Sequence, residues 1–228
     1  MVFFVGAGTG AADLITVRGM RLLKQADVII YAGSLVNPEL LQYAKVECEI
    51  RNSAKLTLDE VIDIMQKAEA QNKKIVRLHT GDPSIYGAVR EQMDELDKLG
   101  IAYESCPGVS ACFGAAASLN LEYTLPEVSQ SLIITRMEGK TKVPEKENIE
   151  SFAAHQTSMA IYLSTGMLGE LSQRLMTEVL SASELDPQSI QIIRQMVGDL
   201  TQKQVELVSS VDNNMIGGFK MEFDNNLY

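Results

Sequence analysis

Short apolar runs alternate along the chain with longer stretches in which apolar residues recur every three or four positions. The runs at 2–6 (VFFVG), 27–33 (DVIIYAG) and 74–83 (KIVRLHTGDP) predict buried strands. Between them, the apolar periodicity after Thr16 and across 57–71 predicts two helices. Because strand and helix alternate, we expect a largely parallel sheet covered by helices, which is the α/β class.

The alternation continues and then breaks once. A helix is expected at 84–100 with Gly100 as its stop, then a strand and loop at 102–111, and then the small-residue helix ACFGAAASL. The stretch 120–130 (NLEYTLPEVSQ) interrupts the pattern and predicts a boundary between domains 1–122 and 123–228. For the second α/β domain we expect strands at 131–137 and 158–164, and helices near 145–154 and at 166–178.

Composition narrows the class of protein. The chain has 228 residues, of which 46% are hydrophobic, so two small domains can each bury a core. No apolar run approaches the ~20 residues that cross a bilayer, and the first residues lack the basic start of a signal peptide, so we expect a cytoplasmic protein without a membrane partner. The net charge of −10 argues against nucleic acid. With three cysteines and two histidines, no metal site is expected.

Two glycine loops follow predicted strands. Gly6-x-Gly8-x-x-Ala11 matches the spacing of the dinucleotide-binding fingerprint, which also requires an acid at the carboxyl end of the second strand. Here Asp27 precedes that strand, so a tight turn or a different ligand is favoured over a dinucleotide.

The second loop, HTGDPSIYG at 79–87, places Gly81-Asp82-Pro83 at a strand's end, where open α/β sheets bind their ligands. Asp82 can accept hydrogen bonds there from an amine, a ribose or loop amides, and the alternative is that it caps the following helix.

Taken together, these motifs resemble the tetrapyrrole methylase family, and within it the methyltransferases of precorrin-4 and cobalt-precorrin-4. The stretches that carry the resemblance are VGAGTGAADLITVRG, ADVIIYAGSLV, VRLHTGDPSIYGA, CPGVSACFGAAA, LIITRMEGKT and IYLS, in register over residues 2–178. The opening loop departs from the family's usual Gly-x-Gly-Pro-Gly-Asp-Pro, because Thr9 replaces the first proline and Ala11-Ala12 follow Gly10.

The resemblance implies two α/β domains with the active cleft between them, S-adenosylmethionine as the cofactor, and methylation of an acidic tetrapyrrole at ring carbon 11 in cobalamin synthesis. It also implies a homodimer. The implied cofactor contacts are Gly81, Asp82, Pro83, Ile85, Tyr86, Ser110, Ala111 and Leu163, although Ile85 and Leu163 are equally consistent with core packing. The implied substrate contacts are Gly8, Thr9, Asp13, Tyr31, Ser34 and Arg136. The side chains that could pair with substrate carboxylates are Arg18, Arg51, Arg90, Arg136 and Lys140. No residue is identified as a catalytic base.

The last fifty or so residues resemble a different protein. ELDPQSIQIIRQM, KQVELVSSVD and MIGGFKMEFDNNLY are similar to the carboxyl-terminal part of the ATP synthase delta subunit. This similarity favours a chimera joined near Glu178 over chance convergence in a divergent methyltransferase tail. The pattern predicts a strand at 179–183, a helix after Pro187 and strands at 204–210 and 215–223, a foreign β-α-β-β segment that completes the second domain. Three functions stay open: an active methyltransferase, a folded but inactive chimera that keeps part of the cofactor cleft, or a delta-like interaction module.

Overall fold

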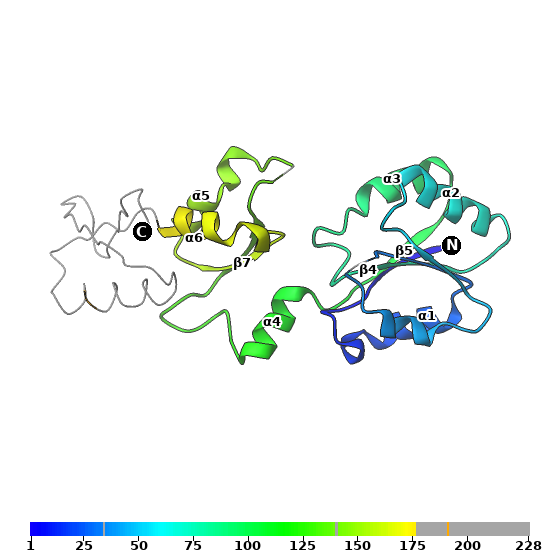
Figure 1. Cartoon of the computed structure of the whole chain (residues 1–228), viewed down its shortest axis with the longest axis horizontal. Coiled ribbons are helices and arrows are strands. Elements are labelled where there is room, and N and C mark those ends of the chain that lie inside the picture. The colour runs from blue at the N-terminus through cyan, green and yellow to red at the C-terminus, as the bar shows by residue number, and fades with distance from the viewer. Residues whose placement is uncertain (34, 140, 177–190, 192–228) are drawn as a thin grey trace. The chain divides into compact units, whose positions relative to one another are not determined.

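The computed structural model describes residues 1–33, 35–139, 141–176 and 191. The chain divides into two compact units, the first spanning Met1–Leu121 and the second beginning at Glu122, so that the break falls inside the 120–130 stretch. Figure 1 shows the elements of each unit. In the part of the chain that the structure describes, no helix is both long and apolar enough to cross a membrane.

The first unit is built on a parallel sheet of five strands in the order β3-β2-β4-β1-β5. The strands are β1 (Val2–Gly6), β2 (Val28–Tyr31), β3 (Glu49–Asn52), β4 (Ile75–His79) and β5 (Tyr103–Cys106). The helices are α1 (Val17–Gln25), α2 (Leu58–Glu69), α3 (Arg90–Lys98) and α4 (Ala111–Leu119), with short 3-10 turns η1 (Ala12–Leu14) and η2 (Pro38–Tyr43). The α/β class and the parallel sheet are therefore confirmed.

The alternation of side chains along each strand creates two cores, one on each face of the sheet. Phe4 packs with Val61 and Met65 of α2 on one face, and Val5 packs with Leu23 of α1 on the other. Figure 1 shows α1 on one side of the sheet and α2 and α3 on the opposite side. All strands run in the same direction, so their carboxyl ends and the loops that follow them lie along one edge.

Two elements differ from the sequence-based prediction. Strand β3 was not predicted, because EIRN is an edge strand of mostly exposed polar residues without an apolar run. The helix expected at 84–100 begins only at Arg90. Residues 84–89 form a turn instead, in which Tyr86 and Ala88 have φ angles of 53° and 48° that no α-helix contains. Gly100 ends the helix with a φ of 66°, as expected.

In the second unit the described strands are β6 (Leu132–Arg136) and β7 (Ser158–Tyr162), which pair in parallel. They are accompanied by η3 (Glu145–Glu147), α5 (Ile149–Ala153), η4 (Thr165–Met167) and α6 (Leu168–Met176), at the places where strands and helices were expected. A small core forms around Met137, Ile149 and Leu171. The β-α-β-β segment expected at 179–228 lies outside the described residues, apart from residue 191.

Candidate functional site

Three loops of the first unit meet at the carboxyl edge of the sheet, after β1, β4 and β5. Gly8 and Gly81 exchange two backbone hydrogen bonds, with N···O distances of 3.2 Å and 2.9 Å. The Ala7 N–H donates to the His79 carbonyl at 2.7 Å. Gly8, a predicted substrate contact, and Gly81, a predicted cofactor contact, are therefore hydrogen-bonded directly to each other.

Glycines make this crossing possible. A Cβ atom on Gly6 would lie 2.6 Å from both the Gly108 Cα and the Gly81 carbonyl oxygen. A Cβ atom on Gly108 would lie 2.2 Å from the same oxygen. No side chain fits at such distances, so the three backbones touch only because both positions are glycine. The contact of Gly108 was missed, although a glycine soon after each of these strands was visible in VG, TG and PG.

The carboxylate of Asp82 joins two of the loops. Its Oδ2 accepts the Gly108 N–H at 2.9 Å, and its Oδ1 accepts the N–H and the hydroxyl of Ser84. Burial raises the pKa of Asp82, but the hydrogen bonds from Ser84 and Gly108 outweigh it and hold that pKa below its ordinary 3.8. Of the hydrogen-bond donors that the sequence allowed for Asp82, namely an amine, a ribose or loop amides, the structure shows the loop amides. The helix-cap alternative is wrong, since α3 begins at Arg90 with Val89 in the capping position.

The segment that follows Asp82 carries three predicted cofactor contacts. Pro83 is buried, Ile85 is half-buried and Tyr86 is 43% exposed. The positive φ of Tyr86 is uncommon for a residue with a side chain, and such conformations cluster at ligand-binding loops. This segment is therefore a shaped turn that presents an aromatic ring at the surface of the first unit.

The amino-terminal end of α4 faces the same loops. Ser110 is buried in the N-cap position and Ala111 is the exposed first residue of the helix. A Cβ atom on Gly81 would stand 3.7 Å from the Ser110 Cα, which is ordinary contact distance. The Thr9 side chain lies against Gly114, where a Cβ atom would approach Thr9 to 2.6 Å. Thr9, which replaces the first proline of the family's opening loop, is thus packed on α4.

The other predicted substrate residues of the first unit lie apart from this crossing. Asp13 is exposed on η1, and Tyr31 is half-buried at the end of β2. The Tyr31 carbonyl accepts the N–H and the hydroxyl of Ser53, each at 3.0 Å. Ser34 lies outside the described residues.

Arg136 and Leu163 belong to the second unit, where they follow neighbouring strands. Arg136 ends β6 and donates to the carbonyls of Met137, Thr141 and Lys142, each at 3.1 Å. Leu163 follows β7 with a φ of 55° and a 68% exposed side chain. Core packing is therefore wrong for Leu163, because an apolar side chain in a strained backbone remains at the surface.

His79, the last residue of β4, is a buried group that the sequence did not mark out. It is 4% exposed, and its Nε2 atom has no hydrogen-bond partner among the described residues. Burial, helped by the nearby charge of Arg77, lowers the pKa of His79 to about 3. The imidazole is consequently neutral at physiological pH.

The geometry does not fit a dinucleotide fingerprint. Helix α1 begins at Val17 rather than directly after Gly8, so its amino-terminal amides are not beside the first glycine loop. Asp27 stands at the amino end of β2, where it accepts from Lys45 Nζ at 2.6 Å and from the Lys74 N–H at 2.7 Å. An acid held there cannot meet a ribose at the opposite edge of the sheet. Within the described residues, no cluster of His, Cys, Asp or Glu could hold a metal ion.

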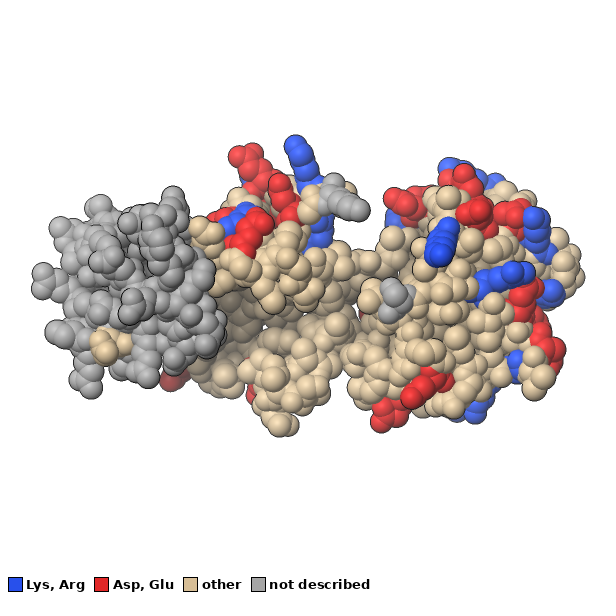
Figure 2. Space-filling model, viewed as in Figure 1, with Lys and Arg blue, Asp and Glu red and all other residues tan. Residues whose placement is uncertain are grey.

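Most of the candidate cations are already paired. Arg18 lies 4.0 Å from Glu104, Arg51 pairs with Glu49, and Arg90 pairs with Asp94. Figure 2 shows positive and negative side chains interspersed over the first unit, with no broad face of one sign in this view. Arg136 binds backbone carbonyls, and Lys140 lies outside the described residues.

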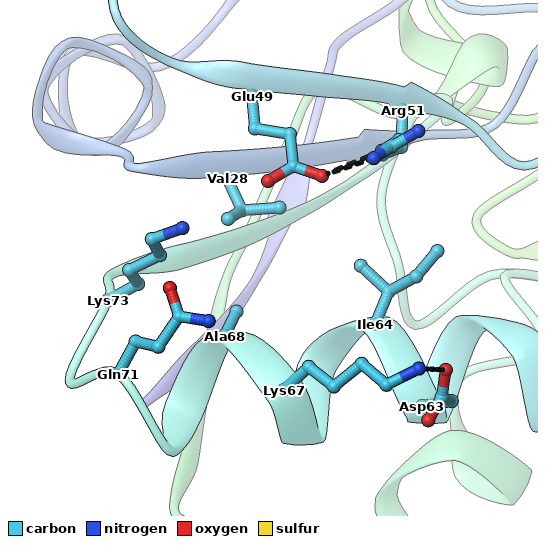
Figure 3. Close-up of a pocket in the computed structure, with 9 residues that line it drawn as sticks. All are labelled: Val28, Glu49, Arg51, Asp63, Ile64, Lys67, Ala68, Gln71 and Lys73. Atoms are coloured by element: carbon cyan, nitrogen blue, oxygen red, sulfur yellow. Dashed lines mark hydrogen bonds and ion pairs between the residues drawn. The ribbon is translucent and has the colours of Figure 1, made fainter.

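A cavity of about 210 Å³ lies elsewhere, between the edge strand β3 and helix α2. Its lining includes Arg51 and Lys67, which Figure 3 shows paired with Glu49 and Asp63. Val28 opens β2 and Lys73 precedes β4, so the cavity reaches toward the amino ends of these strands. It does not coincide with the crossing of the three loops.

Two family models match parts of the chain. The model of the tetrapyrrole (corrin/porphyrin) methylases matches residues 1–187. The model of the ATP synthase delta (OSCP) subunit matches residues 165–228. The two matches overlap around Glu178, in agreement with a junction near that residue.

Curated relatives and a solved structure agree with the first match. The cobalt-precorrin-4 C(11)-methyltransferase of Methanocaldococcus jannaschii is 58% identical over 174 residues, which is 76% of this chain and 67% of that protein. The precorrin-4 C(11)-methyltransferase of Pseudomonas aeruginosa is 45% identical, over 77% of this chain and 70% of that protein. The X-ray structure of a cobalt precorrin-4 methyltransferase superposes with a TM-score of 0.74 at 32% identity, covering 97% of this chain and 94% of the other. The chain therefore belongs to the tetrapyrrole methylase family.

Proposed function

We propose that this protein transfers a methyl group from S-adenosylmethionine to carbon 11 of precorrin-4 or cobalt-precorrin-4 in cobalamin biosynthesis. The observation that carries the proposal is the 58% identity to a cobalt-precorrin-4 C(11)-methyltransferase over 174 residues, which is 76% of this chain. The loops that hold the predicted contacts also lie where open α/β sheets bind ligands.

The crossing of the three loops suits a small cofactor. Gly81 and Gly108 let the loop backbones pack closely together, and Tyr86 adds an exposed ring beside them, a combination of polar backbone and apolar side chain that is typical of ligand sites. We assign the cofactor to Gly81, Asp82, Pro83, Ile85, Tyr86, Ser110, Ala111 and Leu163. Both Asp82 oxygens are engaged by loop donors, so its part is to hold the loops in place for the cofactor.

The protein contributes to the reaction by aligning the cofactor with the substrate carbon. When bound, S-adenosylmethionine supplies a methyl group on a sulfonium sulfur, which is already activated for transfer to a nucleophilic carbon. The glycine crossing and the Asp82 bonds fix the loops before a ligand arrives, so little ordering remains to be paid for at the time of reaction. We assign no residue as a base.

The tetrapyrrole substrate carries several carboxylates, and we assign its contacts to Gly8, Thr9, Asp13, Tyr31, Ser34 and Arg136. Arg136 is the most direct candidate, because its described hydrogen bonds are to carbonyls and leave its charge without a carboxylate counterion among the described residues. A homodimer in the cytoplasm, with no membrane or nucleic-acid partner, completes the proposal.

A second candidate is a folded chimera that binds the cofactor without turning over. The delta-subunit match over residues 165–228 favours it, since the methylase match ends at residue 187 and the delta match continues to residue 228. An interaction with ATP synthase subunits through the same residues is the third reading, and a pull-down that recovers no such subunit would exclude it.

One experiment separates the first two candidates. The full chain is incubated with methyl-labelled S-adenosylmethionine and cobalt-precorrin-4, and in parallel titrated calorimetrically with S-adenosylhomocysteine. Binding together with labelled product supports the methyltransferase, whereas binding without product identifies the inactive chimera. Absence of both contradicts the proposal. Leu163→Ala is expected to weaken binding, with Leu168→Ala as its matched control because Leu168 is also exposed, at 60%, but lies on α6.

A further inference from the structure

A chain of buried and partly buried hydrogen bonds connects the central strand to the turn that carries Tyr86. Arg77 of β4 donates from Nε to the side-chain oxygen of Gln92 at 3.0 Å, and from a terminal nitrogen to the Ile30 carbonyl at 3.3 Å. Gln92, on the first turn of α3, donates from its amide nitrogen to the Ala88 carbonyl at 3.0 Å. Arg77 and Gln92 are 7% and 5% exposed. We refer to Arg77, Gln92 and the Ala88 carbonyl as the latch.

Burying the charged side chain of Arg77 in the latch lowers the stability of the fold, which is unexpected for a purely structural element. Burial lowers the pKa of Arg77 to about 10, and no carboxylate among the described residues forms an ion pair with it. A buried charge without a counterion destabilises the fold, and apolar residues of similar volume commonly serve a core better. Packing of the hydrophobic core therefore does not explain why Arg77 stands at this position.

The 82–89 turn, which the latch contacts at the Ala88 carbonyl, supplies the explanation. Ala88 has a φ of 48°, which costs energy for a residue with a Cβ atom and persists only where its surroundings enforce it. Gly87 is pressed against Pro83, where a Cβ atom would stand 2.2 Å from the carbonyl oxygen. Asp82 fixes the front of the turn through Ser84 and Gly108, and the latch fixes its back at Ala88. Ile85 and Tyr86 lie between these two anchors.

We propose that Arg77 and Gln92 are positioning residues that hold the 82–89 turn in its cofactor-binding shape. Neither side chain touches the cofactor. Arg77 orients Gln92, and Gln92 holds the Ala88 carbonyl so that the backbone at Ile85 and Tyr86 keeps its conformation. The identity of the ligand rests on the proposed function, but the control of the turn does not.

Two variants separate the latch from the core. Gln92→Glu keeps an acceptor for Arg77 and gives it a counterion, while it replaces the donor that faces the Ala88 carbonyl by an oxygen. Arg77→Met combined with Gln92→Met removes both buried partners together, so that neither side chain is left without the other, while the Ile30 and Ala88 carbonyls each lose one donor. Gln66→Glu is the matched control, because it makes the same chemical change at an exposed position of α2.

Hydrogen exchange of the full chain without ligand, followed by calorimetric titration with S-adenosylhomocysteine, tests the proposal. We expect amides 84–88 to exchange about tenfold faster in both latch variants, and affinity to fall about tenfold, which is the effect of losing one hydrogen bond. Gln66→Glu should match the unmodified protein.

Unchanged exchange at 84–88, or faster exchange with full affinity, overturns the proposal. Loss of protection throughout the first unit in both variants also overturns it, because the pair would then serve the core. If the unmodified protein does not bind S-adenosylhomocysteine, the proposed function fails, and the exchange data alone decide whether the latch holds the turn.

Discussion

The Oδ2 atom of Asp82 accepts the backbone N–H of Gly108 at 2.9 Å, across 26 positions of sequence. This bond ties the loop after β4 to the loop after β5 at the point where their backbones cross. It makes Asp82 an organiser of the site, and it gives the loops a fixed relative position that neither could hold alone.

Asp82→Ala is expected to weaken S-adenosylhomocysteine binding at least tenfold while the protein remains folded. The Gly108 and Ser84 N–H groups lose their acceptor, which costs about 1–3 kcal/mol of stability. Calorimetric titration and thermal unfolding measure the two effects. Ser84→Ala is the control, since it removes only the hydroxyl donor. Affinity that is unchanged in Asp82→Ala would contradict an organising role.

The contribution of Asp82 to stability also depends on pH. Its pKa is depressed in the folded protein, so its stabilising effect is present above the ordinary value of 3.8 and is lost as the pH falls through the depressed value. The decrease in the free energy of unfolding caused by Asp82→Ala should therefore be smaller at acid pH than at pH 7.

Gly108→Ala is expected to disrupt the crossing of the loops. Its Cβ atom would meet the Gly81 carbonyl oxygen at 2.2 Å, and a backbone oxygen cannot move aside without shifting β4 or its loop. We expect a loss of several kcal/mol, as for other overpacked sites, and loss of cofactor binding. Gly139→Ala is the matched control, because none of the described residues lies within 4 Å of a Cβ atom there. Equal melting temperatures for the two variants would show that the crossing is more tolerant than the distances imply.

His79→Phe is expected to raise the free energy of unfolding. Phenylalanine keeps an aromatic ring beside Phe4 and removes a buried nitrogen without a partner among the described residues, worth about 1–3 kcal/mol. Chemical denaturation at pH 7.5 measures the change. A less stable variant would contradict the prediction and show that the larger ring overpacks the site.

The same variant tests the pKa of His79. The unfolded chain takes up a proton near pH 6.5, but the folded protein does so only near pH 3, so stability falls as the pH drops through that window by up to ~1.4 kcal/mol per unit. Arg77, which contributes to the lowered pKa, remains charged throughout. Between pH 6.5 and 5, His79→Phe should lose less stability than the unmodified protein, before the carboxylates with depressed pKa values begin to titrate.

Truncation after Glu178 is expected to give insoluble or molten protein. The described part of the second unit has one pair of parallel strands and a small core around Met137, Ile149 and Leu171. Two strands rarely form a stable sheet, and an unpaired edge promotes aggregation. A soluble truncated chain that unfolds cooperatively at the original temperature would show that residues 179–228 are not needed to complete the fold.

Much of the fold is encoded locally and was predictable for that reason. The strands at Val2–Gly6 and Ile75–His79 are continuous apolar runs, and α2 begins at a Thr57–Glu60 capping box with its apolar residues at helical spacing. The order of the elements then required a parallel sheet, and glycines after the strands marked the loops that meet at the carboxyl edge of that sheet. Six motifs in register were sufficient to identify the family.

What only the tertiary structure decided depends on partners distant in sequence. Nothing near Asp82 indicates that Gly108 is its donor, and the helical pattern of 84–89 gives way to a turn because Gln92 and the contact of Gly87 with Pro83 act on it. The burial of Arg77 and His79 follows from their alternate positions on a central strand, where polar residues are unexpected. Periodicity reports which face a residue shares with its neighbours, whereas hydrogen bonds and steric contacts are made through space, and only the packed chain brings their atoms together.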